Sequence, residues 1–352
     1  MQERRRLLER WRQGGAQALV TLVQVEGSSY RRVGARMLVC AEGEYVGGIS
    51  GGCLEAEVLR RATWRVRSGA VVERFSTLFD DTEEMPYGLG CGGTLYLLLE
   101  PTGTPEFAAL MMAMEASLRG ETREIVTVLP QTGAPLQRVV RDAAGCLVFG
   151  QLDDLAMRDE GVFREWLEPP QRLLLCGAGN DAQPMVSLAA QLGWSITVLD
   201  GRAQWARPER FPEAARVLAV STLDGIEIQP RDAVVLMTHS YEQDRAWLAA
   251  VLPQRPRYLG LLGARHRSAL LLSEAAALLG WDVAQVCEHV FAPVGLDLGG
   301  DGAEAIALAT IAEIQACCEG KLGHSQRMTQ EMIAEQIAKG GPSRFLEAQC
   351  AL

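Results

Sequence analysis

The chain has 352 residues, more than the ~250–300 that a single hydrophobic core usually organises, and this length predicts two domains. Its hydrophobic content of 48% is ordinary for a packed globular protein. The formal net charge of −10 argues against a nucleic-acid-binding protein, and no segment approaches the ~18 uninterrupted apolar residues of a membrane span.

The first part of the chain, residues 1–165, is expected to form a smaller α+β domain. It begins with a short amphipathic helix within 1–15, which has no apolar segment behind its basic residues and so differs from an export signal. Apolar runs rich in Val and Leu predict strands at 18–27, 35–43, 70–76, 93–101 and, as a hairpin, within 123–150. Helices are predicted at 53–69, 105–119 and 153–170, and two prolines end the last one as a linker.

From Arg172 the pattern changes to short apolar runs separated by helical segments. Such runs are what a parallel sheet covered on both faces requires, and they lie at 172–176, 195–200, 215–220, 232–239 and 257–264. A long helix is predicted at 301–319, with Asp301 as its N-cap. The predicted fold class is therefore α/β, with a Rossmann-like domain at 170–320, the smaller α+β domain before it, and a polar tail at 321–352.

The cysteines indicate the compartment. There are nine, an odd number, and no two form a CxxC pair, so neither a disulfide framework nor a zinc knuckle is indicated. Most of them lie in apolar runs, which is typical of a reducing environment. The protein is therefore predicted to be cytoplasmic.

A glycine loop opens the Rossmann-like domain. Gly177 permits a tight turn after the first strand, Gly179 lets an anion approach the backbone, and Ala182 allows close packing of the following helix. Asp200 ends the next strand, where an acid would bind a ribose hydroxyl. Two interpretations remain open: the loop binds a nucleotide, or it only packs its helix or meets another phosphate.

The sequence offers few of the other catalytic residues that a dehydrogenase needs. His239 follows an apolar strand at the edge where open α/β sheets bind ligands, although a capping role explains it equally well. Arg245 stands where the Tyr-x-x-x-Lys pair of one dehydrogenase class requires lysine. Gly263 forms a second glycine turn, and the Arg265 that follows it suits a phosphate. Of the four histidines, His266, His289 and His324 show no metal-ligand spacing, so no conventional zinc site is predicted.

Several motifs together resemble the XdhC/CoxI family of xanthine dehydrogenase accessory factors. In the first part these are GSSYRRVGARMLV, GGISGGCLE and GLGCGGTLYLLLEP; in the second they are LLLCGAGNDAQPMVSLAAQLGWSITVLDGR, VLMTHSYEQD, YLGLLGARHR and FAPVGLDLG. They occur in the family's order and cover roughly residues 15–318.

The resemblance implies a chaperone without turnover chemistry of its own. Such proteins bind the molybdenum cofactor, as molybdopterin or its cytosine dinucleotide, and shield it from oxidation. They present it to a cysteine desulfurase for sulfuration and insert it into an apo molybdenum hydroxylase of the xanthine dehydrogenase or carbon monoxide dehydrogenase type. The resemblance also implies a homodimer. The cysteine at position 53 places the sequence nearer the CoxI-like branch, which leaves the hydroxylase undetermined.

A carrier of this cofactor needs donors for its phosphate and soft contacts for its metal. Arg31 and Arg36, in a turn with two serines and two glycines, form a candidate anion cradle, or else a hairpin turn with solvated arginines. Two cysteines are candidate soft contacts to molybdenum, or else small buried hydrophobes in tight turns. They and their glycine neighbours are Cys53 after Gly51 and Gly52, and Cys91 before Gly92 and Gly93.

Two other functions compete with the cofactor carrier. One is an NAD(P)-dependent oxidoreductase built on the Rossmann-like domain, with His239 as its only obvious acid. The other is an assembly scaffold that recruits the desulfurase and the apoenzyme without holding cofactor. Analysis of the purified protein for molybdenum and pterin separates the carrier from the scaffold.

Overall fold

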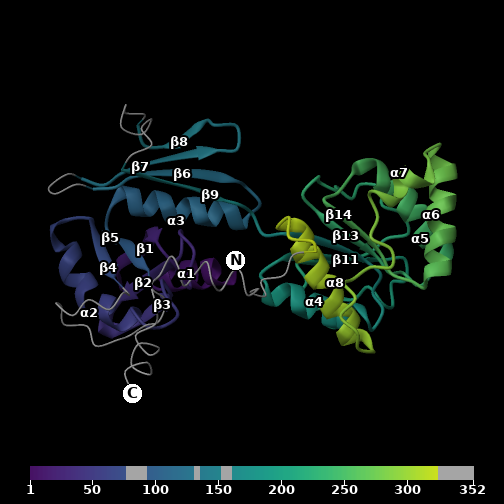
Figure 1. Cartoon of the computed structure of the whole chain (residues 1–352), viewed down its shortest axis with the longest axis horizontal. Coiled ribbons are helices and arrows are strands. Elements are labelled where there is room, and N and C mark those ends of the chain that lie inside the picture. Colours follow the sequence, from purple (N-terminus) through teal and green to yellow (C-terminus); the bar gives the residue numbers. More distant parts are fainter. Residues whose placement is uncertain (77–92, 131–134, 152–160, 324–352) are drawn as a thin grey trace, which may run out of the picture. The chain divides into compact units, whose positions relative to one another are not determined.

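The computed structural model describes residues 1–76, 93–130, 135–151 and 161–323 (Figure 1). Contacts among residues divide the chain into two compact units that change over between Pro169 and Pro170, with Met1–Gln2 assigned to the second unit. Cys91, Gly92 and the predicted tail from residue 324 on lie outside the described residues. None of the described helices combines the length and apolar character that crossing a membrane would require.

The first unit contains an antiparallel sheet of five strands in the order β3-β2-β1-β5-β4. Its strands are β1 (Ala16–Glu26), β2 (Arg36–Cys40), β3 (Tyr45–Gly47), β4 (Val71–Ser76) and β5 (Thr94–Pro101). Both faces of this sheet are covered, which explains why β1 is buried without interruption from Ala18 to Val23. Ala18, Val20 and Leu22 pack in the cluster of α2 (Glu55–Arg65), and Leu19 packs in that of α1 (Gln2–Arg12) and α3 (Pro105–Leu118).

A second antiparallel sheet packs against the other side of α3, so this helix lies between the two sheets (Figure 1). Its order is β8-β7-β6-β9, with strands β6 (Arg123–Val128), β7 (Gln137–Asp142), β8 (Leu147–Phe149) and β9 (Val162–Leu167). Ile125, Val140 and Leu167 share one apolar cluster with Phe107 of α3.

The prediction of a helix over 153–170 is wrong for Val162–Leu167, which form strand β9. This strand pairs with β6 along its whole length. Phe163 and Leu167 are buried, and their spacing of four residues suits a helix as well as a strand. Between them on the inward face of the strand lies Glu165, which forms an ion pair with the buried Arg36. A carboxylate at an inward position hid the alternation that would have indicated a strand.

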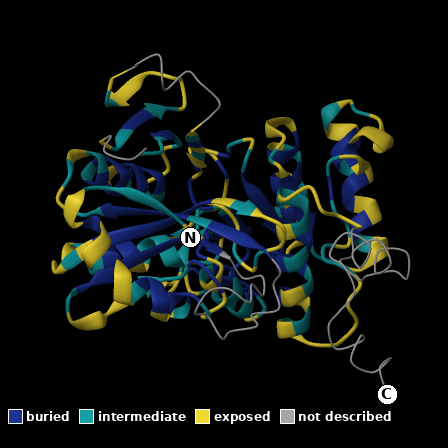
Figure 2. Ribbon diagram, turned by 60° about the vertical axis from the view of Figure 1, so that its left-hand side comes forward, coloured by how far each residue is buried: buried dark blue, intermediate teal, exposed yellow. Residues whose placement is uncertain are grey.

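The second unit is a parallel sheet of five strands in the order β12-β11-β10-β13-β14. Its strands are β10 (Arg172–Cys176), β11 (Ser195–Asp200), β12 (Arg216–Ala219), β13 (Ala233–Leu236) and β14 (Tyr258–Leu261). They coincide with the five apolar runs of the sequence, and the buried strands are dark blue in Figure 2. The predicted α/β fold class is confirmed.

Helices cover both faces of the parallel sheet. On one face pack α5 (Tyr241–Val251), α6 (Arg265–Leu279) and α7 (Val283–Cys287). On the other pack α4 (Ala182–Gln191) and α8 (Ala303–Cys318). Short 3-10 segments lie at Ala41–Gly43, Val66–Ser68, Pro208–Arg210 and Leu252–Gln254. The N-cap of α8 is Gly302 and not the predicted Asp301, whose carboxylate accepts a hydrogen bond from the Gly302 amide at 2.8 Å.

Candidate functional site

Three glycine-containing segments meet in the first unit: the serine–arginine loop (residues 27–36), the glycine loop (residues 47–54) and Gly93, which directly precedes β5. A Cβ placed on Gly51 would lie 3.4 Å from the ring of Tyr30. A Cβ placed on Gly93 would lie 2.1 Å from the carbonyl oxygen of Ser28, so no side chain fits there. The serine–arginine loop therefore contacts both of the other segments.

Ser50 and Glu55 organise the glycine loop. The Ser50 hydroxyl oxygen accepts from the amides of Gly52, Cys53 and Leu54 at 3.3, 3.1 and 3.1 Å, which holds the turn that leads into α2. The Glu55 carboxylate accepts in turn from the Ser50 hydroxyl, from the Ser50 amide at 2.8 Å and from the Ile49 amide at 3.0 Å.

Glu55 is buried, with 3% of its surface exposed. Burial alone would raise its pKa, but the hydrogen bonds from Ser50 and Ile49 outweigh burial and hold the pKa below its usual range. Sequence reasoning missed both Ser50 and Glu55. The available signal was a serine with an acid five residues later, in the first turn of a predicted helix.

Cys53 lies where the glycine loop enters α2. It is half-buried and packs against the cluster that α2 shares with the sheet. Its neighbours Gly51 and Gly52 are exposed, and Gly52 has a φ of +104°, a conformation that L side chains rarely adopt. The thiol therefore combines packing on one side with partial access on the other.

The two candidate arginines differ in their surroundings. Arg36 is buried, pairs with Glu165 and donates to the Gly34 carbonyl at 3.1 Å, so its guanidinium is committed to the fold. Arg31 is more accessible and pairs with Glu3 of α1. The Glu3 carboxylate also accepts from the Gly48 amide at 3.0 Å, which joins α1 to the glycine loop.

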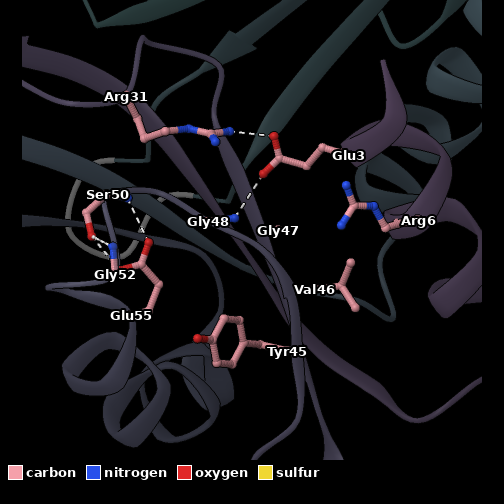
Figure 3. A pocket seen from close by; sticks show the side chains of 10 residues that line it. All are labelled: Glu3, Arg6, Arg31, Tyr45, Val46, Gly47, Gly48, Ser50, Gly52 and Glu55. Atoms are coloured by element: carbon pink, nitrogen blue, oxygen red, sulfur yellow. Dashed lines mark hydrogen bonds and ion pairs between the residues drawn. The ribbon is translucent and has the colours of Figure 1, made fainter. Parts of the chain in front are cut away.

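A pocket of about 400 Å³ opens beside the glycine loop (Figure 3). It lies between α1, β3, the serine–arginine loop and the glycine loop, and it is lined by Glu3, Arg6, Arg31, Tyr45, Val46, Gly47, Gly48, Ser50, Gly52 and Glu55. Its lining is mainly polar and includes two guanidinium groups and two carboxylates.

In the second unit the glycine loop of 177–182 joins β10 to α4 as predicted. Gly177 has a φ of +138°, and a Cβ on it would lie 2.2 Å from the Met237 carbonyl oxygen. A Cβ on Gly179 would lie 2.4 Å from a carboxylate oxygen of Asp181. Ala182 is buried as the first residue of α4. The close approach of the Met237 backbone therefore requires glycine at position 177, whereas a side chain at position 179 would only displace the end of the Asp181 side chain.

Asp200 is fully buried at the end of β11, and its carboxylate is occupied by internal donors. It accepts from the Ala178 amide at 2.7 Å, from the Arg202 amide at 2.8 Å and from the Arg202 guanidinium at 2.8 Å. Burial would raise its pKa, but these hydrogen bonds hold the pKa below its usual range. Asp200 thus fastens the glycine loop to β11, and a ribose would have to displace Arg202.

His239 follows β13 in a left-handed conformation, with a φ of +61°. Its Nε2 lies 2.8 Å from the carboxylate of Asp181, and the ring is 55% exposed. A Cβ on Gly179 would also lie 3.4 Å from this nitrogen. The His239–Asp181 pair therefore lies next to the glycine loop of 177–182. The sequence analysis did not identify Asp181 as the partner of His239.

Two arginines follow the turn after β14, and their surroundings differ. Gly263 has a φ of +157°, Arg265 is exposed at the first position of α6, and Arg267 pairs with the buried Asp244 at 2.7 Å. Among the described residues, the guanidinium of Arg265, unlike that of Arg267, has no hydrogen-bond or ion-pair partner. Across the same ranges, no three His, Cys, Asp or Glu side chains gather in a metal-binding arrangement, and the candidate metal contact Cys91 lies outside them.

Two family models match the chain: "XdhC and CoxI family" over residues 10–76 and "XdhC Rossmann domain" over residues 173–314. A protein from Bacillus subtilis (strain 168), named as a probable xanthine dehydrogenase subunit, is 30% identical over 320 residues, which cover 84% of this chain and 91% of that protein. The chain belongs to the XdhC and CoxI family. The resemblance predicted from the motifs is confirmed.

Other similar proteins also match this family member over most of its length. The molybdenum cofactor insertion chaperone PaoD from Escherichia coli (strain K12) is 28% identical over 305 residues, 86% of this chain and 83% of that protein. A crystal structure described as a xanthine dehydrogenase from Bacillus halodurans matches with a TM-score of 0.79 and 26% identity, covering 95% of this chain and 99% of that one.

Proposed function

We propose that this protein is a molybdenum-cofactor chaperone. It holds the cofactor as cargo in its N-terminal unit and inserts it into an apo molybdenum hydroxylase of the xanthine dehydrogenase or carbon monoxide dehydrogenase type. The observation that carries the proposal is that three glycine-containing segments contact one another and that one of them contains the partly accessible Cys53. The similarity to a cofactor insertion chaperone supports it.

The residues of this site fit such a cargo. Gly51 and Gly52 are exposed, and nothing lies within 4 Å of a Cβ placed on Gly52, so a flat pterin can approach the backbone there, beside the ring of Tyr30. The Cys53 thiol is a soft donor of the kind that suits a metal centre with sulfur ligands. One or two thiols do not close the coordination sphere of the metal, which suits a protein that must release its cargo.

The proposal includes the partners and the setting implied by the resemblance. The cofactor is presented to a cysteine desulfurase for sulfuration before insertion, the protein works as a homodimer, and the compartment is the cytoplasm. Cys91, Gly92 and Gly93 stay in the proposed cofactor site because Gly93 contacts the serine–arginine loop. Pterin analysis of the retained cargo decides between molybdopterin and its cytosine dinucleotide.

The oxidoreductase alternative has less support. A nucleotide at the loop of 177–182 remains a prediction, and it would have to displace Arg202 from Asp200 and compete with the carboxylate of Asp181. His239, the acid predicted for this alternative, is paired with that carboxylate. Gly263 and Arg265 remain predicted contacts for a phosphate at the same edge of the sheet.

The test is cofactor retention by the full chain. The protein is purified anaerobically from cells that make molybdenum cofactor, and molybdenum and pterin are measured after gel filtration. We expect both in the wild-type protein and much less in Cys53→Ser, whereas Cys146→Ser, which alters an exposed cysteine just before β8, should retain wild-type amounts. A wild-type protein without molybdenum or pterin contradicts the carrier and leaves the scaffold.

A further inference from the structure

The pocket of Figure 3 is a distinct feature from the thiol of Cys53, which is not among the residues that line it. Its volume of about 400 Å³ lies within the usual range of small-molecule sites. The glycine loop forms one wall with Gly47, Gly48 and Gly52, so backbone groups are accessible there. Two arginines and the backbone of glycines lie in the lining beside two carboxylates, and guanidinium groups and backbone amides are the donors typical of anion sites.

A carboxylate of the chain itself already lies between two anion donors of this pocket. Glu3 accepts from the Gly48 amide at 3.0 Å and from the guanidinium of Arg31. A backbone amide of a glycine turn and a guanidinium are the donors that proteins commonly direct at phosphate. Glu3 is partly exposed on α1, so its carboxylate is a replaceable occupant of this position.

Arg6 lies one turn after Glu3 on α1 and also lines the pocket. In the described parts of the chain, no hydrogen bond or ion pair engages its guanidinium, and Figure 3 shows it at the pocket without a partner. The second carboxylate, Glu55, accepts hydrogen bonds from Ser50 and Ile49 and forms no ion pair with Arg6. Among the described residues that line the pocket, the Arg6 guanidinium therefore remains available to an anion.

We propose that this pocket binds the phosphate group of a phosphate ester through Arg6, Arg31 and the Gly48 amide, and that Glu3 is the internal carboxylate which the phosphate displaces. This inference deepens the proposed function and rests on it for the source of the ester. That source is the phosphate of the pterin cargo, either as a terminal monoester or as the pyrophosphate link to cytidine.

The first experiment titrates the cofactor-free full chain with inorganic phosphate by calorimetry, at constant ionic strength, and follows the Gly48 amide by NMR. Arg6→Gln is expected to weaken phosphate binding about tenfold, the effect of losing one charge-assisted hydrogen bond. Glu3→Gln is expected to strengthen binding several-fold, because the competing charge is removed. Folding is not at risk in Arg6→Gln, since the side chain is exposed and engages no described residue.

Arg5→Gln is the matched control, because Arg5 is the neighbouring arginine of α1 and does not line the pocket. It should bind phosphate like the wild type. Equal weakening by Arg5→Gln and Arg6→Gln, or no response of the Gly48 amide, overturns the proposal, since binding would then reflect only the general charge of α1.

Two further titrations distinguish the sources of the phosphate. Tighter binding of pyrophosphate and cytidine diphosphate than of inorganic phosphate assigns the pocket to the dinucleotide link, and equal binding assigns it to a terminal phosphate. If the protein binds phosphate but does not retain molybdenum, the proposed function is wrong and the phosphate pocket still stands. If the protein retains cofactor, also as Arg6→Gln, but binds no phosphate, only the proposal for the pocket is wrong.

Discussion

The imidazole Nε2 of His239 lies 2.8 Å from the carboxylate of Asp181, and both groups stand beside Gly179 in the loop between β10 and α4. In a dinucleotide-binding domain the anionic pyrophosphate occupies the N-terminal end of this helix. Here a carboxylate of the protein itself takes that position. We therefore expect the Rossmann-like unit to bind nucleotides weakly.

Removing this carboxylate should increase nucleotide affinity. We expect Asp181→Ala to bind ADP about tenfold more tightly than the wild type, about 1.4 kcal/mol, because like charges no longer face each other. Calorimetric titration of the full chain measures the change. Glu304→Gln, which removes an exposed acid from the first turn of α8, serves as the control and should leave ADP affinity unchanged. A wild-type affinity as tight as that of Asp181→Ala would show that the carboxylate is no obstacle.

Glu55 makes the stability of the first unit depend on pH. The pKa of Glu55 in the folded state is held below the ordinary value of 4.5. The ionised carboxylate therefore contributes fully to stability above pH 4.5, and this contribution is lost as the pH falls through the folded-state pKa. We expect Glu55→Gln to lower the free energy of unfolding by about 2 kcal/mol near pH 7, the cost of weakening buried hydrogen bonds to a charged group.

Urea unfolding measured at neutral pH and at successively lower pH values below 4.5 tests this prediction. The difference between wild type and Glu55→Gln should shrink towards acid, because protonation removes the charge from the wild-type side chain. Glu304→Gln again provides an exposed control. A difference that stays constant from neutral to acid pH would contradict a charged Glu55 in the folded protein.

Gly93 is predicted to be intolerant of any side chain. A Cβ there would lie 2.1 Å from the Ser28 carbonyl oxygen, and the backbone of the serine–arginine loop would have to move. We expect Gly93→Ala to destabilise the protein by about 1–3 kcal/mol, as overpacking does, and to separate the loop from β5. Gly103→Ala is the matched control, since nothing lies within 4 Å of a Cβ at that position. Thermal unfolding of the two variants tests this prediction, and Gly93→Ala should have the lower melting temperature. Equal melting temperatures would refute the close contact.

The parallel sheet was predictable because four of its five strands are largely buried, the exception being the edge strand β12. Such strands are continuous apolar runs, and the five runs of the second half became β10 to β14 in chain order. β9 was not predictable from the same rule, because Glu165 occupies an inward position and is neutralised by Arg36 from a strand far away in sequence. A pattern of apolar residues does not reveal an ion pair formed only after folding.

The candidate site was predictable in part for a similar reason. Glycine clusters mark places where backbones approach each other, and Gly51 and Gly93 do contact the serine–arginine loop. The same sequence contained no indication that Arg202 would cover Asp200 or that Asp181 would pair with His239. These contacts depend on side-chain directions at the ends of separate strands and helices, which motif spacing does not specify.

The hydrogen bonds of Ser50 and Glu55 have a consequence for the proposed transfer of cargo. The loop from Ile49 to Leu54 is held by the side chains of Ser50 and of Glu55 at the start of α2, so no ligand is needed to give it shape. Binding at this loop then requires little ordering of its backbone. A carrier with such a rigid cradle can be emptied and refilled without refolding, and the partner enzyme has only the contacts of the cargo itself to overcome.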